Sequence, residues 1–380
     1  MQTLFTVSAG FFEVRPGPFH EAEAAQLISM LTPANREAWC AVGLAAASIF
    51  CMGGVIFGIA SLYPVLYYER ALEASSCSAD VVSVSCVLRR GDKCCEDQQL
   101  QYTFMSSIAL FVADGSMLVF GEISDRLGPR MCYGVGASLA WLGMVLLGVG
   151  ARVGSDACWY LATFAIGASG PGVFMGCLML GEKYPELHGV ISAVAASMWD
   201  ASALVFMIFN GVYFATANAH ERPVLGLDVI AFSWLGLTVP LGLLTLRVIP
   251  SLAEVHQLRG RGEGASDDQG DTRALTGAVD DSTDNTGSPP PSAGRGVPPT
   301  PTFASYFFRT DTVLLLGFMS VMNLKSSLYI TTFAEEAALL FPSSLAQALA
   351  TTFNLAFPLG GFFTSVLEHL CLPLGSTECH

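Results

Sequence analysis

Charged side chains are scarce in this sequence. Only 13% of the 380 residues are charged, whereas 52% are apolar, and an ordinary soluble domain carries about twice that share of charge. This composition excludes a chain made mainly of soluble globular domains. The few charges are mostly acidic and give a net charge of -14, which argues against a nucleic-acid partner.

Histidine is also rare. The six histidines fall in predicted loops, tails or span ends: His20, His188, His220, His256, His369 and His380. No buried metal site and no histidine-dependent nucleophile is therefore expected. We predict that the protein is not an enzyme and that it needs no cofactor and no metal.

The first 38 residues are not expected to contain a signal peptide. The apolar stretch at 4–12 has no basic region before it and no clear cleavage site after it, and a secretory signal needs both. We therefore expect the first membrane span to direct insertion by itself.

The sequence instead contains apolar runs of about 20 residues, long enough to cross roughly 30 Å of hydrocarbon as helix. Barrel strands would alternate in polarity at every second residue, whereas these runs are apolar on all sides and so predict helices. We predict an all-α membrane protein with about eight spans. Their predicted ranges are 39–66, 103–121, 131–151, 157–180, 189–214, 227–249, 312–333 and 345–367.

The amino-acid composition changes after the sixth span. Residues 251–305 are rich in Pro, Gly, Ser and Asp, a composition that buries too little apolar area to offset its ordering entropy. We predict a cytoplasmic segment at 1–38, a six-helix bundle at 39–250, a disordered linker at 251–305 and an incomplete second half at 306–380. A carrier of two six-helix halves has this layout, so we expect a C-terminally truncated product.

Basic residues predict the orientation. A cytoplasmic N-terminus places eleven Lys and Arg residues inside and six outside, in agreement with the positive-inside rule. Four cysteines, Cys77, Cys86, Cys94 and Cys95, then lie in the first outside loop, where disulfides can form. Their pairing stays open. We expect a multi-pass protein, most simply of the plasma membrane.

The most specific motif lies between the second and third spans and runs from Gly121 to Arg130 as GEISDRLGPR. It resembles the signature loop of the major facilitator superfamily, G-x-x-x-D-R-x-G-x-R, although Met131 stands where a further basic residue is usual. Gly128 permits a tight turn, Asp125 can face a helix N-terminus, and Arg126 and Arg130 hold the loop at the cytoplasmic surface. Such a loop can latch two halves of a carrier; the alternative is a plain basic turn.

A narrower resemblance is carried by GGVIFGIASLYPVL, KYPELHGVISAVAASMWDASALVF and SYFFRTDTVLLLGFMSVMNLKSSLYITT. These segments are similar to solute carrier family 43 and the related apicomplexan amino-acid transporters. The resemblance implies a major-facilitator-type bundle that moves amino acids, large neutral or cationic, by alternating access. Another small solute such as a nucleobase, or a truncated product that transports nothing, is the alternative.

Three charges fall near the middle of the predicted spans: Asp114, Asp200 and Lys325. A charge facing lipid at this depth costs at least about 2.5 kcal/mol, so these side chains should face the bundle interior or a water-filled cavity. Either they sense substrate or proton, with Lys325 as a partner for one carboxylate, or they are bonded within packed helices. Small residues one turn apart on the fifth span would let the eighth approach Asp200, with Asn354 as a polar partner.

Glycine-rich stretches of spans one and four can expose backbone groups to a ligand or serve as helix contacts. An amino acid needs donors for its carboxylate and carbonyls or a carboxylate for its ammonium. The candidate substrate-binding residues are Gly54, Gly58, Ser61, Ser169, Gly170, Asp200, Lys325 and Tyr329.

The linker prediction can be tested by limited proteolysis from the cytoplasmic side. The first cuts should fall within residues 251–302, because a segment without a packed core exposes its backbone to protease. Protection of this segment, with first cuts elsewhere, would contradict both the linker and the orientation.

Overall fold

The computed structural model describes residues 36–73, 93–216, 225–258 and 341–375, together with scattered positions between 309 and 340. Within these ranges the chain is helical and holds no strand. The elements are α2 (Arg36–Met52), η2 (Val55–Leu62), α3 (Tyr63–Tyr68), α5 (Lys93–Leu127), α6 (Pro129–Val153), α7 (Asp156–Leu178), α8 (Leu180–Lys183), η3 (Pro185–Leu187), α9 (His188–Ala201), α10 (Leu204–Ala215), α11 (Leu227–Val248) and α15 (Ser343–Gly375).

Six helical segments of the described residues are long and apolar enough to cross a membrane. They coincide with the first six predicted spans, so the prediction of a multi-pass, all-α membrane protein is confirmed. The predicted eighth span falls on α15. Most of the predicted seventh span lies outside the described residues.

The first span is interrupted. α2 ends at Met52, and after Gly53 and Gly54 the chain continues as the 3₁₀ segment η2. Two adjacent glycines destabilise α-helix because they lose the most backbone freedom on folding. Pro64 then lies in the first turn of α3, where its missing N–H removes no helical bond. The glycine pair therefore coincides with the end of the α-helical part of the first span.

The fifth span is interrupted as well, between α9 and α10 at Ser202 and Ala203. No glycine or proline marks this break. The Ser202 hydroxyl donates to the carbonyl oxygen of Trp199 at 2.5 Å, and such back-bonding bends helices. In contrast, α7 continues through Pro171, so proline does not end the fourth span as glycine ends α2.

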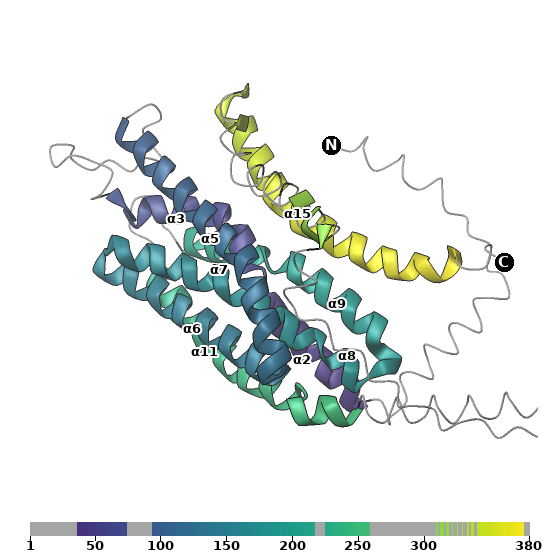
Figure 1. The fold of residues 1–380 in the computed structure, drawn as a ribbon. Helices are drawn as coiled ribbons and strands as arrows, with labels where there is room; N and C mark the ends of the chain where they lie inside the picture. The colour runs from purple at the N-terminus through teal and green to yellow at the C-terminus, as the bar shows by residue number, and fades with distance from the viewer. Residues whose placement is uncertain are drawn as a thin grey trace, which may run out of the picture.

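Figure 1 shows the first six spans side by side, with α6 and α11 on one flank and α15 on the opposite flank beside α9. The close pair of α6 and α7 packs through glycines: a Cβ on Gly136 would lie 2.7 Å from the amide nitrogen of Val173. Small residues at such contacts let helices approach within lipid. Large apolar side chains such as Phe111, 79% exposed, point outward, as expected of a surface covered by hydrocarbon.

A buried polar group ties α2, α6 and α11 together. The hydroxyl of Ser48 lies 2.9 Å from that of Tyr133 and 2.8 Å from that of Thr245. Thr245 also donates to the Leu241 carbonyl of its own helix at 3.0 Å. All three side chains are buried, and each hydroxyl is satisfied, as burial away from water requires.

Two predicted boundaries differ from the structure. Residues 252–258, assigned to the linker, are helical, and Val255 is buried, so the linker can begin only after them. Cys94 and Cys95 lie in the first turn of α5 and not in a loop. Cys77 and Cys86 lie outside the described residues, and the disulfides stay a prediction.

The packing of η2 against the break in the fifth span makes a prediction for Gly58. A Cβ on Gly58 would overlap the Ala203 carbonyl oxygen. Gly58→Leu should therefore destabilise the bundle by about 1–3 kcal/mol through overpacking, seen as a lower melting temperature in detergent. Gly43→Leu is the control, because a Cβ on Gly43 meets nothing within 4 Å. Equal melting temperatures for the two variants would contradict the contact.

Candidate functional site

The signature motif forms a turn of one residue. α5 runs through Gly121, Asp125 and Arg126 to Leu127, and α6 begins at Pro129, so Gly128 alone joins two helices. Its φ of 91° is a conformation that only glycine adopts readily, which confirms the predicted tight turn. The ten-residue motif was expected to form a loop. In the structure, nine of its residues are helical and only Gly128 connects the two helices. Leu252 covers Gly128, 2.7 Å from the position of an added Cβ.

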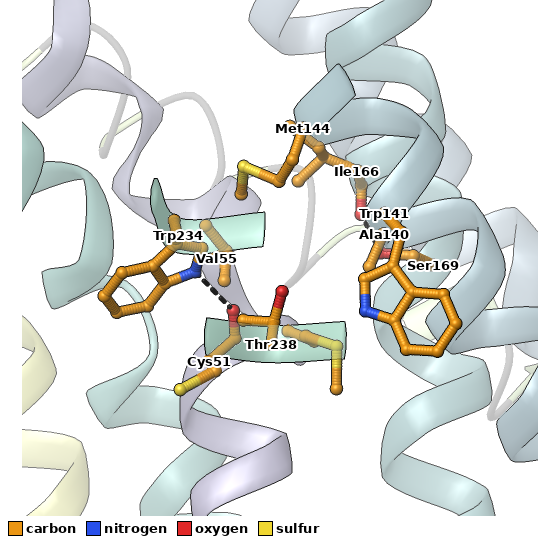
Figure 2. Close-up of a pocket in the computed structure, with 10 residues that line it drawn as sticks. Cys51, Val55, Ala140, Trp141, Met144, Ile166, Ser169, Trp234 and Thr238 are labelled. Carbon is orange, nitrogen blue, oxygen red and sulfur yellow. Dashed lines mark hydrogen bonds between the residues drawn. The ribbon is translucent and has the colours of Figure 1, made fainter. Parts of the chain in front are cut away.

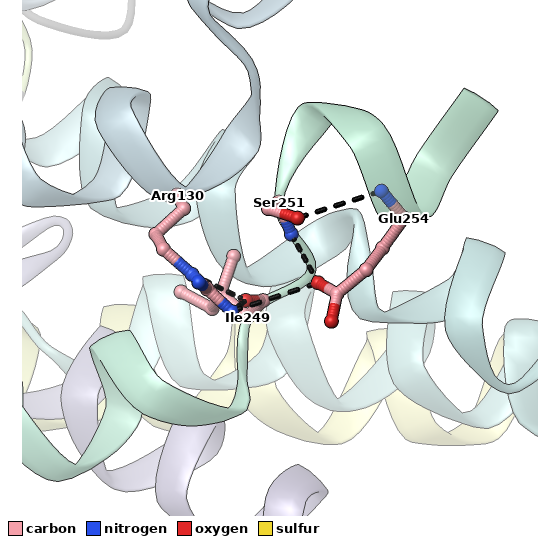
Figure 3. Close-up of polar contacts among 4 residues, drawn as sticks. All are labelled: Arg130, Ile249, Ser251 and Glu254. Carbon is pink, nitrogen blue, oxygen red and sulfur yellow. Dashed lines mark hydrogen bonds and ion pairs between the residues drawn. The ribbon is translucent and has the colours of Figure 1, made fainter. Parts of the chain in front are cut away.

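Arg130 joins the turn to the end of the sixth span. Its Nε and Nη2 atoms donate to the Ile249 carbonyl oxygen at 3.0 and 2.9 Å, where α11 leaves backbone carbonyls without helical partners. Nη2 also lies 3.6 Å from Oε2 of Glu254, as Figure 3 shows. The guanidinium therefore caps one helix and pairs with a carboxylate just beyond it.

Glu254 is itself held in place. Its Oε2 accepts from the backbone N–H of Ser251 at 2.6 Å, and the Ser251 hydroxyl accepts from the Glu254 N–H at 3.4 Å. This reciprocal pair is a capping box, which starts a helix. The sequence SLAE carries its spacing, so this signal could have placed the helix at 252–258 and named Glu254 beside Arg130.

The other motif residues lie differently. Arg126 forms an ion pair with Glu122 one turn earlier on α5 and its side chain is 77% exposed. Asp125 is exposed on the last turn of α5, and a Cβ on Gly121 would meet nothing within 4 Å. The motif therefore has two parts. Its inward part, Gly128 and Arg130, contacts the chain at the end of α11. Its outward part, Gly121, Asp125 and Arg126, makes no such contact.

Three of the candidate glycines gather where the two broken spans meet. A Cβ on Gly54 would lie 2.6 Å from the Trp199 carbonyl oxygen and 2.8 Å from the Ser202 hydroxyl oxygen. Gly58 lies against the Ala203 carbonyl, and Gly170 of α7 against the Gly53 carbonyl. Each of these glycines lies against the backbone of a neighbouring element. In this conformation they therefore allow the elements to pack closely.

The two candidate serines face inward. The Ser169 hydroxyl is fully buried and donates to the Ile166 carbonyl at 2.7 Å. The Ser61 carbonyl accepts from the side-chain amide of Asn210 on α10. Both groups therefore have protein partners.

Ser169 lines a small cavity between α2, α6, α7 and α11, drawn in Figure 2 with Trp141, Trp234 and Thr238. The Trp234 indole N–H donates to the Cys51 carbonyl at 3.3 Å, at the end of α2. The cavity has a volume of about 10 Å³, room for about one water. In this conformation it is therefore too small for an amino acid.

Asp200 lies at the end of α9, partly buried, and its carboxylate contacts Gly361 of α15. The predicted neighbourhood of the fifth and eighth spans is confirmed, but the contact is two turns beyond Asn354. One turn before Asp200, the Ser197 hydroxyl is buried with no hydrogen-bond partner among the described residues. Ser197 is one of the small residues of the fifth span for which the sequence predicts only a packing role.

The remaining candidates do not join this group. Asp114 lies partly buried on α5. Tyr329 packs its ring 5.6 Å from that of Phe353 on α15. Lys325 is exposed, and within the described part of the chain no ion pair joins it to Asp200. The structure thus brings Gly54, Gly58, Gly170 and Asp200 together, whereas Tyr329 packs on α15 and Lys325 is exposed.

No protein-family model matches the chain. Among curated proteins, Protein FMP42 of Saccharomyces cerevisiae (strain ATCC 204508 / S288c) is 29% identical over 196 residues. The match covers 50% of this chain but only 37% of the yeast protein's length. The two proteins are distant homologues, and membership of the major facilitator superfamily stays a prediction.

The geometry at the turn separates the two arginines of the motif. Arg130→Ala removes two hydrogen bonds from a charged donor and should destabilise the protein by about 1.5–3 kcal/mol, measured as a lower melting temperature in detergent. Arg126→Ala, the matched control, removes one exposed pair on a single helix and should change stability by less than about 0.5 kcal/mol. Equal losses in the two variants would contradict the assigned contact.

Proposed function

We propose that the protein is a carrier that moves amino acids across a membrane by alternating access between two helical halves. The observation that supports it best is the bundle of six spans combined with the signature motif, whose glycine turn and arginine cap lie at one end of the bundle. A carrier needs such rigid units, because alternating access is largely the movement of one half against the other.

The proposed domain plan follows from this function. Residues 39–250 form the first half, the polar stretch after 258 is a cytoplasmic linker, and α15 belongs to the second half. α15 packs on α9, so the halves meet along the fifth and eighth spans. The outward part of the motif, with exposed Asp125, then offers a latch to the second half, and the N-terminus is cytoplasmic in a plasma-membrane protein.

Asp200 is the proposed contact for the substrate ammonium. It lies where the fifth span breaks and where α15 approaches, so movement of α15 changes the surroundings of its carboxylate. A carboxylate at mid-membrane is retained where it serves a substrate or ion path. The alternative, that Asp200 only balances Lys325, has no ion pair within the described residues to support it.

Uptake of radiolabelled solutes into proteoliposomes tests the proposal. The wild-type protein should accumulate leucine, phenylalanine or arginine above protein-free vesicles, and adenine should not compete. Asp200→Asn should lower uptake by about tenfold, as loss of one charged contact implies, with normal expression and insertion.

The alternative makes the opposite prediction. If Asp200 only balances Lys325, each single neutralisation leaves an unpaired charge, and Asp200→Asn with Lys325→Met together should regain folding and transport. Unchanged uptake in both single variants would reject both roles. Uptake of adenine in place of amino acids would reject the substrate class.

A further inference from the structure

The small cavity beside the end of α2 is lined by a hydrogen-bond donor that lacks an acceptor. The indole nitrogen Nε1 of Trp141 is buried and has no hydrogen-bond partner among the described residues, and Trp141 lines this cavity. An indole N–H can only donate, and leaving a buried donor unsatisfied costs its full desolvation free energy. The cavity should therefore hold an acceptor for Trp141.

The orientation of this indole is fixed by α11. A Cβ on Gly242 would lie 2.6 Å from Cζ2 of Trp141, so the ring rests directly on the backbone of this glycine. Thr238 lies one turn before Gly242 on the same helix and therefore on the same face. In Figure 2 the indole nitrogen is on the side of the ring that faces Thr238, whose hydroxyl points into the space between the helices. Turning the N–H away from the cavity would disrupt the packing on Gly242.

Two buried hydroxyls supply acceptors in the same lining. The Thr238 hydroxyl donates to the Leu235 carbonyl at 3.4 Å, and the Ser169 hydroxyl donates to the Ile166 carbonyl at 2.7 Å. Each hydroxyl uses its single hydrogen within its own helix, so its lone pairs stay available. Neither is bonded directly to Trp141. The cavity therefore offers one donor and two acceptors, which come from α6, α7 and α11.

Water is the ligand that matches both this lining and this volume. The cavity of about 10 Å³ has room for about one water, which can accept from the indole and donate two hydrogen bonds. A metal cation or an ammonium ion has no lone pair for the Trp141 N–H. An anion would find no basic side chain in the lining, and an organic solute is too large.

We propose that this cavity is a specific site for one water molecule, which accepts from Trp141 and donates to Thr238 and Ser169. The water links α6, α7 and α11 beside Cys51 and Met52, where α2 ends and the first span is interrupted. Within hydrocarbon, polar groups near such an interruption need partners in the protein or an ordered water. The water is therefore a structural link at the break of the first span, and this inference does not depend on the proposed function.

Proton NMR of the whole protein in detergent micelles, with isotope-labelled tryptophan, tests the site directly. The Nε1 proton of Trp141 should show a cross-peak to water, because a bridging water stays within hydrogen-bond distance of the indole. Trp141→Phe identifies its signal among those of the five tryptophans; if this variant does not fold, replacing the other tryptophans one at a time identifies the same signal. Trp159 is the matched control, because its Nε1 is also buried without a partner among the described residues but does not line the cavity. Absence of the Trp141 cross-peak would show a dry cavity, and an equally strong one for Trp159 would show general entry of water; either result overturns the inference.

Thermal melting in detergent gives an independent test. Thr238→Val keeps the shape of the side chain but removes an acceptor from the water, so the melting temperature should fall by about 2–4 °C. Thr163→Val is the matched control, because the Thr163 hydroxyl is buried and donates only to carbonyls of its own helix, at 3.0 and 3.1 Å; its loss should lower the melting temperature less. In a dry cavity, the methyl group that replaces the Thr238 hydroxyl would fill apolar space and leave the melting temperature equal or higher. That result, or equal losses for the two variants, would overturn the inference.

Discussion

The backbone contact between η2 and the break in the fifth span is the constraint on which the rest of the structure depends. In hydrocarbon every backbone polar group has to be satisfied within the protein, so a broken helix persists only where another element covers it. Gly54 and Gly58 have no side chain, and they bring one broken span directly against the carbonyls of the other, at Trp199 and Ala203. The two interruptions therefore stabilise each other.

This contact also arranges the candidate site. Because η2 lies so close to α9, Phe57 reaches Trp199, and Gly170 lets α7 bring Phe174 to the same place. Asp200 follows on the next residue, against α15. In the proposed carrier, this carboxylate therefore lies at the edge of the first half, where the second half would move against it. At the far end of the bundle, Arg130 holds the turn after α5 to the end of α11, so movement of the turn would carry the sixth span with it.

Hydropathy predicted the spans well because lipid imposes apolar length. The predicted third span, 131–151, differs from α6 (Pro129–Val153) by two residues at each end. The second span was predicted at 103–121, whereas α5 extends from Lys93 to Leu127. The extra turns contain polar residues such as Gln98, whose side chain donates to the Ala71 carbonyl at 2.7 Å. Hydropathy identifies the part of a helix that lies within lipid, but it does not detect the polar continuation of the helix outside.

The contacts of the site were less predictable, because they join distant positions. Gly128 and the glycine pair after α2 have a local signal, since they need a conformation that other residues avoid. Nothing local in the sequence connects Arg130 with Ile249 or Phe174 with Trp199. The break at Ser202 also has no glycine or proline, and it arises from a serine back-bond beside a close neighbour. Such features depend on the packed bundle and become visible only there.

Counterflow in proteoliposomes tests the central claim, alternating access by an amino-acid carrier, most directly. Vesicles loaded with unlabelled leucine should take up external labelled leucine faster than empty vesicles and accumulate it transiently above the outside concentration. A carrier behaves in this way because its binding site carries unlabelled leucine outward and then returns with labelled leucine from outside. Equal rates in loaded and empty vesicles, or uptake that never exceeds the outside concentration, would contradict the account.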